Sequence, residues 1–307
     1  MPPETFADRM KTIARMGCRV LPLDVAIDHL QSGTLPPMSV AITFDDGFHN
    51  FFAAAYPILK EFGYPATVYQ TTFYSGWNKP VFHLLCHYLL WKASGQTIEA
   101  YPIIGRRGPF DLRAEEGIDA AGVEIWNFAR SAGLSPEERQ RLAKTLADSV
   151  GQDYQKISDQ RLFNLMNKEE LSQMVKWGVD IQLHTHRHRV PTRKDLFLKE
   201  LMDNQDFLKK IGQLKATHFA YPSGVYREEV FPWLSEFGIR SASSCDTGLV
   251  SSWSNPMCLP RFIDTTQISN LEFEAWLCGL RAVLPGRLNG RSHRPVSSQD
   301  CISEPQL

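Results

Sequence analysis

The sequence lacks the features that mark membrane, secreted and nucleic-acid-binding proteins. No apolar run approaches the roughly 18 residues that span a bilayer. The N-terminus has no charged start followed by an apolar core, so we expect no signal peptide. The 33 lysines and arginines nearly balance the 34 aspartates and glutamates, which leaves a net charge of −1. This balance argues against nucleic acid or an acidic membrane surface as a partner.

Cysteine is sparse, and its spacing does not match the usual disulfide or metal patterns. The six cysteines contain no Cys-x-x-Cys pair and are scattered at Cys18, Cys86, Cys245, Cys258, Cys278 and Cys301. Most have apolar neighbours, which favours reduced thiols over a disulfide framework. We therefore expect a cytoplasmic localisation.

The composition is that of a globular protein, with 43% hydrophobic and 22% charged residues. A strand at 39–44, a helix at 51–62 and a strand at 65–70 form a unit so compact that parallel pairing is favoured. The same alternation returns after residue 166, with strands predicted at 179–183, 216–221, 239–244 and 259–263. We expect an α/β fold whose site lies beyond the carboxyl ends of the strands.

Residues 75–165 interrupt this alternation, and we predict a mostly helical insertion there. From about residue 284 the chain is polar and rich in proline, glycine, serine and arginine. Such a composition buries too little apolar surface to fold, so we predict a disordered tail at 284–307. The rest of 1–283 would form one domain.

The insertion opens with a strongly apolar helix at 81–91. This helix suits core packing, and it would also suit a lipid-linked substrate. His83 and His87 lie four residues apart on it, a spacing that can bind a metal. No carboxylate is near them in the sequence, so we predict a packing role for this pair.

Two adjacent carboxylates, Asp45 and Asp46, end the apolar run at 39–44, and Gly47 follows. Adjacent residues of a strand point to opposite faces, so the two acids diverge unless the backbone turns, and Gly47 permits such a turn. One carboxylate would then reach a metal while its neighbour reaches a water or a substrate. A strand that runs into an ordinary Asp-Gly turn explains the same residues equally well.

His184 and His188 lie four residues apart, directly after the strand predicted at 179–183. If the segment makes one turn, both imidazoles can bind a single ion. His186 lies between them and would point elsewhere. Three histidines within five residues at a strand end favour a metal site.

Asp46, His184 and His188 would together form a set of two histidines and one carboxylate. Such a set holds Zn²⁺ or non-haem Fe(II) and leaves coordination positions open for water and substrate. Asp45 separates the two possibilities, because hydrolysis uses a general base beside a metal-bound water. An oxygenase has no comparable use for a second carboxylate. The residues therefore favour a hydrolase, with an iron oxygenase as the alternative.

Three motifs resemble those of a known family, the polysaccharide deacetylases, also called the NodB-homology group or family four carbohydrate esterases. The first two are Thr43-Phe44-Asp45-Asp46-Gly47 and His184-Thr185-x-x-His188. The third, Phe219-Ala220-Tyr221-Pro222-Ser223-Gly224, resembles the variant Phe-Ala-Tyr-Pro-Tyr-Gly of the branch that includes poly-N-acetylglucosamine deacetylases. The resemblance covers about 1–73 and 166–283, and it implies a distorted (β/α) barrel.

The resemblance also implies roles for individual residues. Asp45 would be the general base, and Asp46, His184 and His188 would hold a divalent metal. Zn²⁺ is the expected ion, with Co²⁺, Ni²⁺ or Mn²⁺ as alternatives. The backbone N–H of Ser223 would contribute to an oxyanion hole, a role open to any residue except proline.

The sequence departs from the family pattern in two places. The third-motif arginine that orients the base is Ala220 here, and we hypothesise that Arg261 supplies its charge. The family's late Leu-x-His motif, whose histidine protonates the leaving amine, is not found. His186, a residue of the insertion or a metal-polarised water are the candidate acids. We also predict that Tyr221, His186 and Asp246 contact the substrate.

We expect a metal-dependent hydrolase that removes an N-acetyl or other N-acyl group from an amino sugar or glycan, including lipid-linked forms. Two alternatives stay open at this stage. One is a non-catalytic carbohydrate-binding relative, and the other is a deformylase or another amide hydrolase of the same fold. The sequence leaves the oligomeric state undefined.

Overall fold

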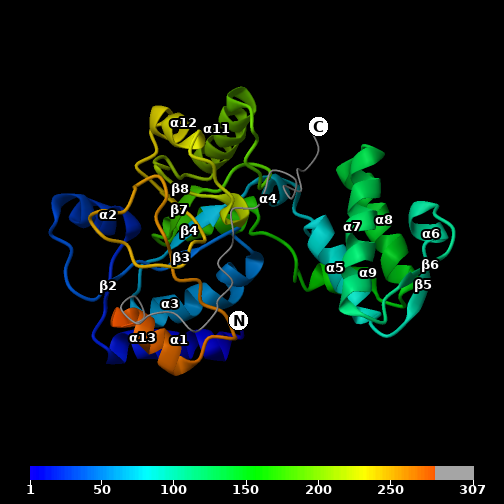
Figure 1. Cartoon of the computed structure of the whole chain (residues 1–307), viewed down its shortest axis with the longest axis horizontal. Helices are drawn as coiled ribbons and strands as arrows, with labels where there is room; N and C mark the ends of the chain where they lie inside the picture. The colour runs from blue at the N-terminus through cyan, green and yellow to red at the C-terminus, as the bar shows by residue number, and fades with distance from the viewer. Residues whose placement is uncertain (281–307) are drawn as a thin grey trace. The chain divides into compact units, whose positions relative to one another are not determined.

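The computed structural model describes residues 1–280, which divide into two compact units (Figure 1). Unit 1 comprises Met1–Gly76 and the residues from Met166 on, and unit 2 comprises Trp77–Leu165. Unit 2 thus covers nearly the same residues as the predicted insertion at 75–165, while the tail predicted at 284–307 lies outside the described residues. Within residues 1–280, every helix is too short or too polar to cross a membrane.

Unit 1 contains a five-stranded sheet in which every neighbouring pair is parallel. In spatial order its strands are β3 (Thr43–Phe44), β4 (Thr67–Gln70), β7 (Asp180–Leu183), β8 (His218–Ala220) and β9 (Ser241–Ser243). The sheet is curled and surrounded by helices (Figure 1). The predicted distorted (β/α) barrel is therefore confirmed, in the form of an open half-barrel.

Helices cover this sheet because their apolar faces need a partner. They are α1 (Pro3–Arg15), α2 (Leu23–Ser32), α3 (Tyr56–Phe62), α4 (Phe73–Trp77), α10 (Lys168–Lys176), α11 (Lys194–Lys210), α12 (Val230–Phe237) and α13 (Asn270–Leu277). A π-helical turn at Phe51–Ala55 precedes α3, and a 3₁₀ turn at Pro222–Gly224 follows β8. Val68, Ile181 and Phe219 from the central strands are fully buried in the core. The strand β7 alternates polar and apolar residues, yet Gln182 is buried as well as Ile181 and Leu183, so both faces of the strand are covered.

The stretch at 39–44, predicted as one buried strand, is two short and only half-buried strands. β2 (Ser39–Val40) pairs with β1 (Arg19–Val20), whereas β3 pairs with β4. The carbonyl of Val40 accepts from the Leu21 N–H at 2.9 Å, and the carbonyl of Ile42 accepts from the Thr67 N–H at 3.0 Å. The stretch breaks because its two halves hydrogen-bond to different neighbours.

The prediction of a strand at 259–263 is wrong. Only Leu259 pairs with the sheet, through a single bridge to Ser243. The neighbouring backbone makes loop contacts instead, such as the Arg261 N–H donating to the Asp246 carbonyl at 2.8 Å. This segment therefore follows the sheet edge without extending the ladder.

Unit 2 is built around its own apolar core. Its elements are α5 (Phe82–Lys92), β5 (Thr97–Glu99), α6 (Tyr101–Ile104), β6 (Pro109–Asp111), α7 (Glu115–Ser131), α8 (Pro136–Ser149) and α9 (Tyr154–Asp159). Leu85, Leu89 and Leu90 of α5 are buried against α7 and α8. The apolar character of the helix at 81–91 is therefore explained by packing inside unit 2.

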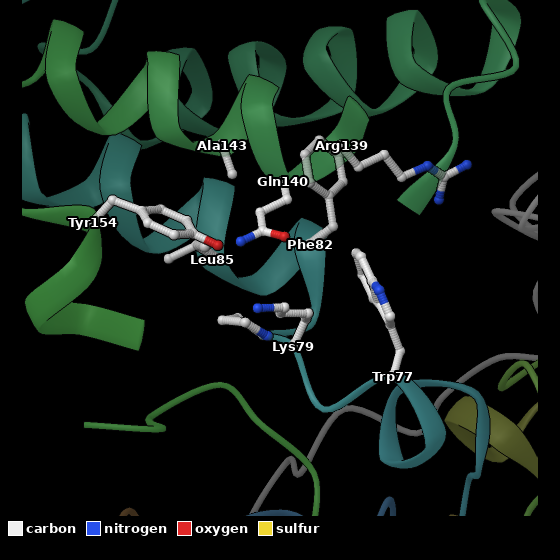
Figure 2. Close-up of a pocket in the computed structure, with 9 residues that line it drawn as sticks. Trp77, Lys79, Phe82, Leu85, Arg139, Gln140, Ala143 and Tyr154 are labelled. Atoms are coloured by element: carbon white, nitrogen blue, oxygen red, sulfur yellow. The ribbon is translucent and has the colours of Figure 1, made fainter. Parts of the chain in front are cut away.

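A small cavity lies inside unit 2 between the start of α5 and α8 (Figure 2). Its lining mixes apolar and polar side chains, from Trp77, Lys79, Pro80, Phe82, Leu85, Arg139, Gln140, Ala143 and Tyr154. None of these residues belongs to the predicted site.

Candidate metal and catalytic site

The predicted site residues lie at the carboxyl ends of the parallel strands of unit 1. Asp45 and Asp46 follow β3, the histidine segment follows β7, and Ser223 follows β8. Parallel strands present these ends at one edge of the sheet, so residues some 140 positions apart in the sequence come together. The site is therefore a consequence of the sheet order β3-β4-β7-β8-β9.

Asp46, His184 and His188 converge on one point. Oδ1 of Asp46 lies 3.2 Å from His184 Nε2 and 3.1 Å from His188 Nε2. One ligand atom from each residue lies within 4.8 Å of the others. Within residues 1–280, this is the only group of three or more histidine, cysteine or acidic side chains arranged to hold an ion.

The chemistry of these donors fits a divalent metal. His184 is buried, and its Nδ1 donates to the Ala220 carbonyl at 2.8 Å. This hydrogen bond fixes the tautomer and turns the Nε2 lone pair toward Asp46, an arrangement common in metal-binding histidines. His188 and Asp46 are each about one-third exposed, so the site is open on one side.

Electrostatics keep Asp46 ionised. Burial alone would raise the pKa of its carboxyl, but hydrogen bonds and positive charge from His184 and His188 lower that pKa well below its ordinary value. In turn, burial would lower the pKa of His184, but the neighbouring carboxylates raise it. A carboxylate that stays ionised across the physiological range is suited to bind a cation.

The two acids diverge because the backbone turns at Asp46. Asp46 has φ +66° and Gly47 has φ +76°, and the Gly47 N–H donates to the Asp45 carbonyl at 2.8 Å. The sequence placed this turn at Gly47 alone, whereas it begins one residue earlier. A left-handed aspartate is strained, and such strain is typical of functional sites.

Asp45 binds Arg261 through two parallel hydrogen bonds. The guanidinium donates from its two terminal nitrogens to the two carboxylate oxygens, each at 2.7 Å. The Nε of Arg261 donates to the Ser244 carbonyl at 2.9 Å, and its charge lies over the Tyr69 ring. Burial alone would raise the pKa of Asp45, but Arg261 and His184 together lower it. The base and its hypothesised orienting residue are thus in direct contact.

Ser223 occupies a tight turn directly after β8. Its backbone is left-handed, with φ +56° and ψ 15°, and the Gly224 N–H donates to the Tyr221 carbonyl at 2.8 Å. A Cβ on Gly224 would lie only 2.5 Å from the Cβ of Cys245, so glycine is required for this close approach. The role of the Ser223 N–H in an oxyanion hole stays a prediction.

Tyr221 contradicts its predicted role as a substrate contact. Its side chain is fully buried, and its hydroxyl donates to the Met257 carbonyl at 2.8 Å. The ring packs against Phe219, Tyr226 and Phe231. The side chain points into the core because Tyr221 comes directly after a strand whose two faces are both covered.

His186 and Asp246 lie near the site but outside the metal-ligand group. Nδ1 of His186 is 2.8 Å from the Thr72 hydroxyl, and its ring meets Phe73 edge-on. Burial and the charge of Arg187 lower the pKa of His186. Asp246 is exposed, and its carboxylate accepts from the Ser244 hydroxyl at 2.9 Å. Contacts of both residues with substrate stay predictions.

The competing histidine pair in unit 2 forms no metal group among the described residues. His83 meets the Trp126 ring edge-on, and Nε2 of His87 lies 3.8 Å from the Asp119 carboxylate at the surface. Both side chains are exposed, so the predicted packing role of this pair is wrong. Helix α5 packs through its other face, which carries Leu85, Leu89 and Leu90.

The sequence analysis missed two polar residues that support the site. The Gln70 amide donates to the Asp46 carbonyl at 3.0 Å, and Asn204 accepts from the His184 N–H at 2.9 Å. Asn204 lies on α11 among the buried residues Leu201 and Leu208. The helical spacing of these leucines could have placed Asn204 on the buried face of α11, but it could not have identified His184 as its partner.

Comparison with known proteins identifies the family. The polysaccharide deacetylase family model matches residues 32–85 and 149–242, which contain both aspartates and both histidines of the site. This chain belongs to the polysaccharide deacetylase family. Family membership supports a hydrolytic enzyme that deacetylates a glycan. No curated protein has significant sequence similarity to the chain.

Solved structures of low sequence identity share the fold. The Streptococcus pyogenes deacetylase PplD in complex with acetate is 17% identical, with a TM-score of 0.57, and the match covers 92% of this chain and 87% of that one. IcaB from Ammonifex degensii is 18% identical, with a TM-score of 0.56 and coverages of 91% and 90%. These similarities support the half-barrel architecture of this member of the polysaccharide deacetylase family.

Proposed function

We propose that this polysaccharide deacetylase homologue is a metal-dependent hydrolase that removes N-acetyl groups from amino sugars of a glycan. One observation carries the proposal. Adjacent carboxylates have separate partners, since Asp46 meets two histidines while Asp45 is held by Arg261. This separation matches what hydrolysis needs, namely a ligand set for the ion and, beside it, a carboxylate base that is not itself a ligand.

Asp46, His184 and His188 would hold the divalent ion, with Zn²⁺ favoured and Co²⁺, Ni²⁺ or Mn²⁺ as alternatives. When bound, such an ion acts as a Lewis acid toward the acyl oxygen and lowers the pKa of a coordinated water. The Ala220 carbonyl keeps His184 in the tautomer that this binding requires. His188 is about one-third exposed, which leaves a path for substrate.

Asp45 would accept the proton of the attacking water. Its lowered pKa keeps the carboxyl ionised at neutral pH, and Arg261 fixes its orientation through both oxygens. The water oxygen adds to the acyl carbon, and the Ser223 N–H donates to the oxygen that becomes negative. The amide C–N bond then breaks, which releases acetate and the amine.

The departing nitrogen needs a proton, and we assign this step to Asp45. A carboxylic acid whose pKa is lowered by Arg261 returns its proton readily. His186 is the weaker candidate, because its lowered pKa leaves the imidazole neutral at neutral pH. One group acting first as base and then as acid would explain how the site works without the family's late histidine.

The test is acetate release from N-acetylglucosamine oligomers. Asp45→Asn should lower kcat by about 10²- to 10⁴-fold, the usual contribution of general acid–base catalysis, while metal content stays unchanged. His188→Ala should lose both metal and activity, and a chelator should reproduce this loss until Zn²⁺ is added back. Asp206→Asn, an exposed acid on α11, is the matched control and should keep full activity.

The outcomes also separate the rival functions. Oligomer binding without release of any acyl group would favour a carbohydrate-binding protein and overturn the proposal. Release of formate from an N-formylated amino sugar, without release of acetate from the N-acetylated oligomers, would assign a deformylase. Dependence on Fe(II) and an oxidising co-substrate would assign an oxygenase.

We also propose a cytoplasmic localisation. The cysteines of residues 1–280 are free thiols, which is compatible with a reducing compartment.

A further inference from the structure

The histidine segment, residues 184–189, has an unusual backbone. Thr185 has φ +61° and His188 has φ +52°, and neither is a glycine. Left-handed conformations of such residues cost free energy, and they persist only where the surrounding structure enforces them. Some part of the molecule outside the metal ligands must therefore hold this segment.

Glu200 on α11 makes several of the contacts that do so. Its side chain is 1% exposed, and one carboxylate oxygen accepts from the Arg187 backbone N–H at 2.9 Å. The other accepts from Arg189 Nε at 2.7 Å and from the Arg187 guanidinium at 3.3 Å. The backbone carbonyl of Glu200 also accepts from the His186 N–H, at 3.2 Å. One buried residue thus binds three residues of the segment.

Asn204 holds the other end of the segment from one helical turn further on. Its side chain is fully buried, and its Oδ1 accepts from the His184 N–H at 2.9 Å. Its amide nitrogen donates to the Gln70 carbonyl at 3.0 Å and to the Thr72 hydroxyl at 3.1 Å. Residues four apart on a helix share a face, so Glu200 and Asn204 face the segment together.

We propose that Glu200 and Asn204 are positioning residues that hold the histidine segment in the conformation that brings His184 and His188 to Asp46. The inference rests on the proposed function, because it assumes that these histidines bind the ion. Burying a carboxylate and an amide in a helix face that also carries Phe197 and Leu201 is costly unless they are fully bonded. Their side-chain hydrogen bonds go to the histidine segment and to the end of β4 beside it.

The proposal predicts a change in metal affinity, which can be measured without an activity assay. Co²⁺ binding to the metal-free full chain, followed by visible absorption, measures this affinity. Glu200→Gln should weaken binding by about 10- to 100-fold, the range for residues that orient metal ligands, and should alter the Co²⁺ spectrum. Asn204→Ala should weaken binding in the same direction.

Asp203→Asn is the matched control. Its carboxylate lies 3.4 Å from the same Arg187 guanidinium and on the same helix, but within residues 1–280 its side-chain hydrogen bonds go only to Arg187 and Lys199. This variant should bind Co²⁺ within about twofold of the wild type. Thermal unfolding of each metal-free variant shows whether any loss of affinity exceeds a loss of stability.

Each result decides a separate question. Wild-type affinity and an unchanged spectrum in Glu200→Gln would overturn the positioning role, and Asn204→Ala decides in the same way if Glu200→Gln does not fold. Equal Co²⁺ binding by the wild type and His188→Ala would instead overturn the metal site itself, and the positioning role with it.

Discussion

Asp46 and Gly47 are consecutive residues with left-handed backbone, and this turn sends the two carboxylates of the Asp45–Asp46 pair to different partners. Gly47 is restricted twice. Its positive φ disfavours a side chain, and a Cβ at this position would lie 1.7 Å from the Gln70 side-chain oxygen. Gln70 is itself bonded to the Asp46 carbonyl, so it is not free to move away.

Gly47→Ala should therefore destabilise the fold by about 2–4 kcal/mol through strain and overpacking combined. Gly63→Ala is the matched control, because Gly63 has a similar φ of +65° but open space where its Cβ would lie. It should cost only about 1 kcal/mol. Urea unfolding of both variants measures the difference, and equal losses would show that the Gln70 contact does not matter.

Arg261 acts on the reaction through Asp45, so its removal should change turnover more than binding. Arg261→Met should lower kcat by about 10- to 100-fold with little change in KM, the effect expected of a misoriented catalytic group. Arg227→Met is the control, since Arg227 donates to the Pro191 carbonyl away from the carboxylates. Acetate-release kinetics measure both variants, and near wild-type kcat for Arg261→Met would rule out the orienting role.

At the scale of elements, a polar cluster lies at the amino ends of the strands, whereas the site lies at their carboxyl ends. Nδ1 of His218, on β8, lies 2.8 Å from the Ser241 hydroxyl on β9, and its Nε2 lies 3.2 Å from the Asp24 carboxylate on α2. Asp24 also pairs with Arg240 and Lys215. The cluster joins α2 to β8 and β9.

Stability should depend on pH through His218. Burial lowers the pKa of its imidazole in the folded protein, although Asp24 opposes this. The unfolded chain has the ordinary histidine pKa of about 6.5, so below that pH it binds a proton that the folded state does not. The contribution of neutral His218 is therefore present above pH 6.5 and is lost as the pH falls toward the folded pKa.

His218→Gln should consequently lose less stability than the wild type between pH 7 and pH 5, by on the order of 1 kcal/mol. The free energy of unfolding in urea at the two pH values measures this difference. The variant will be less stable overall because its hydrogen bonds change, so only the pH-dependent difference is informative. Parallel losses in the two proteins would contradict the assignment to His218.

At the scale of the whole molecule, the chain leaves unit 1 after Gly76 and returns at Met166. The segment between them has an apolar core of its own, in which Leu89, Ile125 and Leu146 are fully buried. We predict that residues 77–165 fold when expressed alone, with a cooperative transition and a stability on the order of 5 kcal/mol.

Circular dichroism with thermal unfolding checks this prediction. Ile125→Asp in the same fragment is the control, because a buried charge in the centre of the core should abolish the transition. A fragment that is helical but melts without cooperativity would show that unit 2 depends on unit 1.

Features set by local spacing were determined by the sequence alone. The alternation of strands and helices indicated the parallel sheet. Asp45, Asp46, His184 and His188 were identifiable because each follows a strand, and strand ends meet in a parallel sheet. Such features depend on residues a few positions apart, so the local sequence carries them.

Features that depend on distant partners were decided only by the tertiary structure. The contact of Arg261 with Asp45 joins residues 216 positions apart, and the sequence supplied it only as a hypothesis. Tyr221 is buried because helices and loops cover both faces of β8, which its own neighbours do not reveal. Glu200 was invisible as a site residue for the same reason: a polar residue on a helix acquires a role only from what the fold packs against it.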